Sequence, residues 1–171
     1  GCSGTSNTIN VTVNSLPIVN ITNNGNTSLC QGESVTLISS QSEGNLWSNG
    51  GINNSITIAT SGSYQVTYTD ANGCSNTSNS INVTVNALPQ VNITANGSTA
   101  FCTGGSVQLV SNQNTGNLWS NGLNSATIDV SASGNYSTVV TDNNGCQNTS
   151  NIISVSVSDA PLPTASVIGN N

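Results

Sequence analysis

The chain has 171 residues, with no lysine, arginine or histidine, and six acidic residues give it a net charge of −6. Nucleic-acid binding needs cationic side chains that replace phosphate counterions, and electrostatic binding to anionic lipid needs them too, so this composition excludes both. The usual general bases are missing, and serine or threonine has no evident activating partner. We therefore expect no enzymatic activity, no catalytic residue and no cofactor.

Short stretches in which apolar and polar residues alternate follow one another along the first half of the chain. This alternation is typical of strands that bury one face. The predicted strands span residues 19–22, 34–37, 45–48, 55–58, 63–69 and 79–86. Glycine- and asparagine-rich turns separate them, and no helical periodicity occurs. The pattern predicts an all-β fold, an antiparallel β-sandwich.

Residues of the first half recur 72 positions later. The matched pairs include Trp47 and Trp119, Tyr64 and Tyr136, Gly62 and Gly134, Asp70 and Asp142, and Pro17 and Pro89. A fixed period with matched positions indicates one folding unit copied in tandem. We predict the end of a preceding repeat over 1–14, complete repeats over 15–86 and 87–158, and the start of a following repeat over 159–171. The chain is thus expected to be a segment of a longer protein.

The five cysteines occur without histidine and without the spacing of a zinc finger. Cys30 and Cys74 are 44 residues apart, as are Cys102 and Cys146. If six strands run strictly up and down, the loop before the second and the turn after the fifth lie at the same end. A small unit needs such a staple, so we predict one disulfide per repeat, Cys30–Cys74 and Cys102–Cys146, worth about 4 kcal/mol each. The alternative pairs Cys2 with Cys30 and Cys74 with Cys102.

Two features invite a sharper functional interpretation. Trp47 and Trp119 could stack on sugars, but a single tryptophan before a turn is more typical of a core, and we predict core positions for both. Asp70 and Asp142 each begin an Asp-x-Asn-Gly sequence that faintly resembles a calcium loop. Calcium prefers six to eight oxygen ligands with several carboxylates, so we predict a backbone-capping turn and no metal site.

The sequences S-G-S-Y at Tyr64 and S-G-N-Y at Tyr136 resemble the strand before the last hairpin of immunoglobulin-type domains, where a glycine precedes the tyrosine-corner tyrosine. The two tryptophans resemble the core tryptophan of the third strand in that fold. Two residues after the tyrosine the family has cysteine, whereas this chain has Val66 and Thr138. The resemblance implies tandem Ig-like sandwiches, with Tyr64 and Tyr136 in the core, rather than true immunoglobulin domains.

A more specific resemblance covers nearly the whole chain. The motifs C-x-G-x-S-V, W-S-N-G, S-G-x-Y and D-x-N-G-C, joined by V-N-x-L-P linkers, resemble the tandem Ig-like or PKD-like repeats of very large surface proteins secreted by Bacteroidota, including gliding-motility and biofilm adhesins. The resemblance implies export, display at the cell surface or in extracellular fibres, and a role in adhesion. Disulfides would fit such an oxidising setting.

We therefore expect a structural stalk that provides reach and mechanical and protease resistance, with neighbouring repeats and other copies in a fibre as its partners and no direct membrane contact. Trypsin-like proteases find no lysine or arginine to cleave after. The alternative is a module that binds a glycan or a protein through loops at one end of each repeat. Loops that differ between the copies are the candidates, such as Gln41-Ser42-Glu43 against Gln113-Asn114-Thr115.

Overall fold

The computed structural model describes residues 1–159. Two compact units divide the chain: unit 1 is Gly1–Asn86 and unit 2 begins at Ala87. Every regular element in the described residues is a strand, so the all-β prediction is confirmed. The repeat start predicted over 159–171 lies, except for Asp159, outside the described residues.

The first twenty residues contain no strand. Ile9, Val11 and Val13 match the inward-facing residues of a later strand in the 72-residue period, but here their side chains are 79%, 82% and 90% exposed. The prediction that residues 1–14 end a preceding repeat stays a prediction.

One layer of unit 1 is a three-stranded antiparallel sheet. Its strands, in the order β1-β3-β5, are Ile21–Asn24, Val35–Ser39 and Ser55–Ile58. In β3 the first, third and fifth residues are buried, which is the period of two that a strand needs to present one face to a core. β5 coincides with the strand predicted from the sequence.

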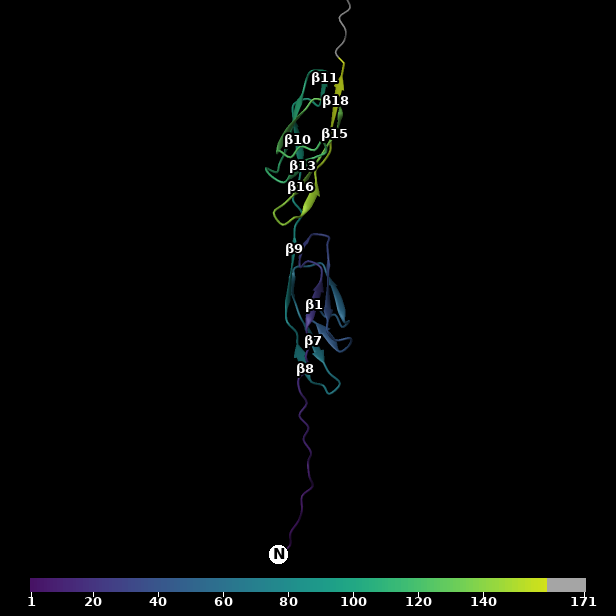
Figure 1. Ribbon diagram of the computed structural model, residues 1–171, viewed down its shortest axis with the longest axis vertical. Helices are drawn as coiled ribbons and strands as arrows, with labels where there is room; N and C mark the ends of the chain where they lie inside the picture. The colour runs from purple at the N-terminus through teal and green to yellow at the C-terminus, as the bar shows by residue number, and fades with distance from the viewer. Residues whose placement is uncertain (160–171) are drawn as a thin grey trace, which may run out of the picture. The chain divides into compact units, whose positions relative to one another are not determined.

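The second layer consists of two short sheets in the orders β4-β7-β8 and β2-β9-β6. Its strands are β2 Ser28–Cys30, β4 Asn45–Trp47, β6 Gly62–Tyr64, β7 Val66–Thr69, β8 Ser75–Thr77 and β9 Ile81–Asn86. Only Gln65 separates β6 from β7, so the two sheets continue one another. Figure 1 labels β7, β8 and β9 of this layer. The order of both layers is that of an immunoglobulin-like sandwich, with β1, β3 and β5 facing β4, β7 and β8.

β2 departs from the predicted antiparallel arrangement. It pairs with β9 in parallel, with Leu29 opposite Val85 and Cys30 opposite Asn86. Because β1 and β3 belong to the other layer, the chain crosses between layers before β2 and again after it. The end of β2 therefore lies beside the end of β9.

Unit 2 contains the same nine strands at the same spacing. They are β10 Ile93–Asn96, β11 Ala100–Cys102, β12 Val107–Ser111, β13 Asn117–Trp119, β14 Thr127–Val130, β15 Gly134–Tyr136, β16 Thr138–Thr141, β17 Gln147–Thr149 and β18 Ile153–Ser158. Each begins and ends 72 residues after its counterpart in unit 1. The sheet orders β10-β12-β14, β13-β16-β17 and β11-β18-β15 also match, and β11 pairs with β18 in parallel.

Each unit has a hydrophobic core of its own, built around a tryptophan. Trp47 is 1% exposed and Trp119 2% exposed, and each indole N–H donates to a loop carbonyl at 2.8 Å, of Asn53 and Ser125 respectively. The buried core of unit 1 is Val19, Ile21, Leu29, Val35, Leu37, Trp47, Ile58, Tyr64, Val66 and Val83. The buried core of unit 2 is Ile93, Val107, Leu109, Trp119, Ile128, Val130, Tyr136 and Val155.

The buried tyrosines form tyrosine corners. The Tyr64 hydroxyl donates to the Thr60 carbonyl at 3.1 Å, and the Tyr136 hydroxyl donates to the Ala132 carbonyl at 3.0 Å. A hydroxyl that reaches back four residues to the backbone fixes the corner before this strand in immunoglobulin-like folds. Val66, two residues after Tyr64, is 0% exposed and packs in the core where immunoglobulin domains carry a cysteine.

An asparagine side chain closes the gap between the layers in each unit. The Asn79 amide accepts from the Ile21 N–H at 2.9 Å and donates to the Ile21 carbonyl at 3.1 Å. Asn151 makes the same pair of bonds with Ile93, at 2.8 and 3.0 Å. The side chain thus replaces a strand partner for the first residue of β1 or β10.

Replacing Asn79 with alanine is expected to lower the free energy of unfolding of unit 1 by about 1–2 kcal/mol, because both backbone groups of Ile21 lose their partner. Asn79→Asp is the matched control, since it keeps the acceptor and removes the donor, and it should still weaken the unit because a carboxylate would then face the Ile21 carbonyl. Urea denaturation followed by tryptophan fluorescence measures both variants. If Asn79→Ala lowered the free energy of unfolding by less than about 0.3 kcal/mol, the two hydrogen bonds between Asn79 and Ile21 would contribute nothing to stability.

Candidate functional site: the two ends of each unit

An aspartate organises the turn between β7 and β8. The Asp70 Oδ1 atom accepts from the Asn72 N–H at 2.9 Å and from the Cys74 N–H at 2.8 Å. The Asp70 N–H donates to the Cys74 carbonyl at 2.9 Å, and Gly73 supplies the left-handed φ of +82° that the turn requires. This is the backbone-capping geometry expected of an Asp-x-Asn-Gly turn, and it places Cys74 as the last residue of the turn.

The turn between β16 and β17 repeats these contacts. Asp142 Oδ1 accepts from the N–H groups of Asn144 at 2.9 Å and Cys146 at 2.8 Å. Over residues 1–159, no three side chains of histidine, cysteine, aspartate or glutamate are grouped so as to hold a metal ion. In both units the aspartate oxygen that a calcium loop would use is engaged by the backbone of its own turn.

Removing the aspartate side chain should destabilise its turn. We expect Asp70→Ala to cost unit 1 about 1–2 kcal/mol, because two backbone N–H groups lose a carboxylate acceptor on a partly buried turn. Asp70→Asn keeps an oxygen at Oδ1 and should recover at least half of the loss. Equilibrium unfolding of both variants measures the difference; equal stabilities for Asp70→Ala and the parent would contradict the capping role.

The opposite end of unit 1 is where β2 and β9 both finish. The Gln31 N–H donates to the Asn86 carbonyl at 2.8 Å, and the Asn86 side-chain amide donates to the Leu29 carbonyl and the Ser28 hydroxyl, both at 3.1 Å. The Cys30 N–H donates to Glu33 Oε2 at 2.8 Å. These bonds fasten the last residue of β9 to its own unit and hold Cys30 beside it.

The same end of unit 2 is built with shorter side chains. The Thr103 N–H donates to the Ser158 carbonyl at 2.8 Å, and the Gly105 N–H donates to the Cys102 carbonyl at 3.0 Å. Serine stands where unit 1 has Asn86, so the side-chain bonds to β2 have no counterpart. The backbone bonds at Cys102 nevertheless match those at Cys30.

Asparagines also fasten the segment through which the chain enters each unit. The Asn76 amide donates to the Pro17 carbonyl at 2.8 Å, and the Asn148 amide donates to the Pro89 carbonyl at 2.9 Å. A glutamine at the start of the β3–β4 or β12–β13 loop adds a second bond: Gln41 donates to Ile18 and Gln113 donates to Gln90, both at 2.8 Å. Gln41 and Gln113 are the first residues of the loops that are candidates for ligand binding. The side-chain amide of each glutamine is thus already bonded within its own unit.

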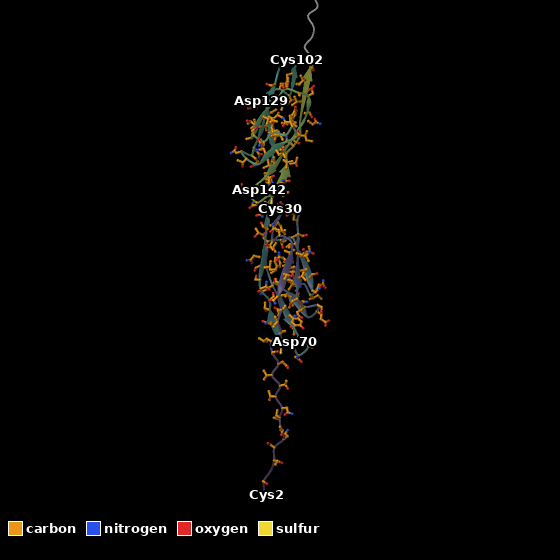
Figure 2. All side chains as sticks on the ribbon, in the orientation of Figure 1. Cys2, Cys30, Asp70, Cys102, Asp129 and Asp142 are labelled. Atoms are coloured by element: carbon orange, nitrogen blue, oxygen red, sulfur yellow. The ribbon has the colours of Figure 1, made fainter. Side chains whose placement is uncertain are left out.

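The predicted disulfides within each repeat are wrong. In unit 1, β8 begins directly after Cys74, and the chain then continues through β9 to Asn86. Asn86 is the pairing partner of Cys30 in the β2–β9 ladder. At roughly 3.3 Å per residue, the path from Cys74 to Asn86 spans up to about 40 Å, whereas bonded cysteines need Cα atoms within about 7 Å. Figure 2 shows Cys30 and Asp70 at opposite ends of unit 1, and Cys102 and Asp142 at opposite ends of unit 2.

The oxidation states of the cysteines agree with this geometry. Cys30 and Cys146 are disulfide-bonded, while the thiols of Cys2, Cys74 and Cys102 are free. Neither pair within a repeat has both members oxidised. The alternative pairing of Cys2 with Cys30 and Cys74 with Cys102 is excluded as well, because Cys2, Cys74 and Cys102 are free thiols.

The described residues have no pocket. They also contain no helix of the length and apolar character that a membrane crossing needs. What the two ends of a unit share is a cysteine held by backbone hydrogen bonds beside a fastened connecting segment, and the fastening side chain is an asparagine at every end except the β11–β18 end of unit 2. The ends, rather than a cleft, are the candidate functional site.

No protein-family model matches the chain, and no curated protein is similar to it. Similar solved structures are immunoglobulin-like or fibronectin-III-like domains. They include murine CEACAM1b, with 15% identity and a TM-score of 0.40 over 82% of this chain and 100% of that chain. Another is the fibronectin(III)-like modules of Clostridium thermocellum CbhA, with 9% identity and a TM-score of 0.34 over 86% of this chain and 100% of that chain. These similarities concern the fold and carry no information about function.

Proposed function

We propose that the chain is a structural segment of an extracellular bacterial adhesin or surface filament, in which the units serve as spacers and not as an enzyme. The proposal is supported by the resemblance of the sequence motifs to repeats of large secreted surface proteins and by the presence of disulfide-bonded cysteines, which persist in oxidising, extracytoplasmic settings. The absence of lysine and arginine from the sequence adds resistance to trypsin-like proteases.

The main structural support for the proposal is the connector between the units, which we define as residues 86–89. The Asn86 side chain and carbonyl are bonded within unit 1, and the Pro89 carbonyl is bonded to Asn148 within unit 2. Only Ala87 and Leu88 stand between these fastened positions, and the proline that follows them has a fixed φ. Two residues leave few backbone dihedrals free to rotate, so the connector is stiffer than a long flexible linker. A stiff connector transmits bending and twisting from one unit to the next.

The experiment compares rotational diffusion of the two units by ¹⁵N relaxation, with all cysteines kept reduced so that only the connector is tested. We expect both units of the parent chain to share one rotational correlation time, because the short connector makes them tumble together. A variant with Gly-Ser-Gly-Ser inserted between Ala87 and Leu88 is the control, and each of its units should show a shorter correlation time of its own.

Asn148→Ala provides the finer comparison, since it removes the bond to Pro89 without lengthening the chain. Its correlation times should fall between those of the parent and the insertion variant. Parent units that tumble as independently as the units of the insertion variant would overturn the spacer function.

A further inference from the structure

The four cysteines of the two units occupy two kinds of position. Cys30 and Cys102 are the last residues of β2 and β11, whereas Cys74 and Cys146 are the last residues of the aspartate-capped turns. One cysteine of each kind, Cys30 and Cys146, is disulfide-bonded. The other cysteine of each kind, Cys74 and Cys102, is a free thiol.

The free cysteines are held in the same local geometry as the bonded ones. The backbone N–H of Cys74 donates to Asp70 at 2.8 Å, and that of Cys146 donates to Asp142 at 2.8 Å. The Cys102 carbonyl accepts from the N–H of Gly105 at 3.0 Å, and the Cys30 carbonyl accepts from the N–H of Glu33 at 2.9 Å. A position that supports a disulfide in one unit therefore has the same backbone hydrogen bonds in the other unit, where the thiol is free, although the Cys30 N–H bond to Glu33 has no counterpart at Cys102.

Both unused thiols are open to reaction. Cys102 is exposed and Cys74 is partly exposed. Each lies at the end of its unit, and the two ends are of different kinds: Cys74 is at the turn end of unit 1 and Cys102 is at the β11 end of unit 2. Figure 2 labels Cys102 at one end of unit 2, and it labels Asp70, the first residue of the turn that ends at Cys74, at one end of unit 1.

We propose that Cys74 of one copy of this chain forms a disulfide with Cys102 of a second copy, so that chains join head to tail through complementary ends. A contact between two different ends does not close on itself, and its repetition yields an open covalent polymer. The proposal does not depend on the spacer function, because units that tumble independently could be joined in the same way.

Formation of this bond removes two protons and two electrons from the two thiols. A low-molecular-weight disulfide such as oxidised glutathione accepts the electrons. The Cys74 thiolate attacks one glutathione sulfur, which forms a mixed disulfide and releases one glutathione thiolate. The Cys102 thiolate of the second copy then attacks the Cys74 sulfur, releases the second glutathione thiolate and leaves the Cys74–Cys102 bond.

The test uses chains of all 171 residues with one free thiol each. C2S/C74S retains only the Cys102 thiol, and C2S/C102S retains only the Cys74 thiol. One variant is labelled with ¹⁵N, the two are mixed in equal amounts in a glutathione redox buffer, and the covalent dimers are weighed by mass spectrometry. We expect roughly a tenfold excess of the mixed dimer over each homodimer, which is about fivefold above the statistical level and corresponds to a preference of about 1 kcal/mol.

The single variant C2S retains both thiols and should form a ladder of covalent oligomers whose peptide map contains a Cys74–Cys102 link. C2S/C74S/C102S is the matched control and should stay monomeric, with the circular dichroism of the parent chain. A mixed dimer at only the statistical twofold level would overturn the proposal. It would also be overturned if C2S lost its free thiols but stayed monomeric.

Discussion

Replacing Trp47 with alanine should unfold unit 1 and leave unit 2 intact. The side chain is 1% exposed, it is surrounded by the buried residues of its own unit, and its indole N–H is bonded to the Asn53 carbonyl. Truncating a buried tryptophan costs about 3–5 kcal/mol, a large share of the roughly 5–15 kcal/mol that stabilises a domain. Each unit has one tryptophan, so in this variant the fluorescence of Trp119 reports unit 2 alone.

The measurement is urea denaturation in reducing buffer, followed by fluorescence and by circular dichroism. The Trp119 transition of Trp47→Ala should coincide with that of the parent, while about half of the circular dichroism signal is lost at a lower urea concentration or is absent from the start. Trp119→Ala should show the reverse, with Trp47 reporting an unchanged unit 1. If the urea midpoint of the Trp119 transition in Trp47→Ala fell by as much as the midpoint of unit 1, the result would contradict the claim that each unit has a core of its own.

The second large effect is expected at Gly44, where β4 begins beside the end of β7. The φ angle of Gly44 is +72°, and a Cβ atom there would lie 2.6 Å from the Thr69 carbonyl oxygen. A residue with a side chain faces the strain of the left-handed conformation, about 1–2 kcal/mol, and an overlap that costs about 1–3 kcal/mol more. We expect Gly44→Ala to lower the free energy of unfolding of unit 1 by about 2–5 kcal/mol.

Gly50 separates the two contributions. Its φ angle is +88°, but a Cβ atom there would meet nothing within 4 Å. Gly50→Ala should therefore cost only the conformational strain, about 1–2 kcal/mol. Thermal unfolding followed by tryptophan fluorescence compares the two variants, and equal losses would refute the close approach at Gly44. Gly116 and Gly122 offer the same comparison in unit 2.

The strands with an apolar face were predictable from the sequence. β5, β7 and β9 lie within the predicted ranges, and β6 begins one residue before its range, because Ile58, Tyr64, Val66 and Val83 alternate with polar residues and are buried. The single strand predicted over 63–69 is divided at Gln65 in the structure, since β6 pairs with β9 and β7 pairs with β4 and β8. A break of this kind depends on the partners of a strand, which periodicity does not contain.

Two strands of each unit were not predicted, and both lack an apolar pattern. β8 is Ser75–Thr77, with three exposed polar residues, and it is held by the ladder to β7 and by a hydroxyl pair between Thr69 and Ser75 at 2.8 Å. β2 is three residues long and buries only Leu29. Both strands exist because a neighbouring strand presents free backbone groups to them.

The assumption of strict alternation led to the wrong disulfides. Six strands that run alternately up and down put the two cysteines of a repeat at one end, and they require the second and fourth strands to run in the same direction. The structure has these two strands, β3 and β5, as antiparallel neighbours, so the chain reverses once less before β7 and the turn at Cys74 lies at the end of the unit opposite to Cys30. The spacing of 44 residues was compatible with a bond, but only the strand pairing could decide between the two ends.

The separation of Cys30 from Cys74, and of Cys102 from Cys146, is tested most directly by a non-reducing peptide map. Free thiols are alkylated under denaturing conditions, and chymotrypsin then cleaves between the cysteines at aromatic residues and leucine. Alkylated Cys74 and Cys102 are expected, with no peptide that links Cys30 to Cys74 or Cys102 to Cys146. A peptide with either link would contradict the parallel pairing of β2 with β9 and, with it, the assignment of the two cysteines to opposite ends of each unit.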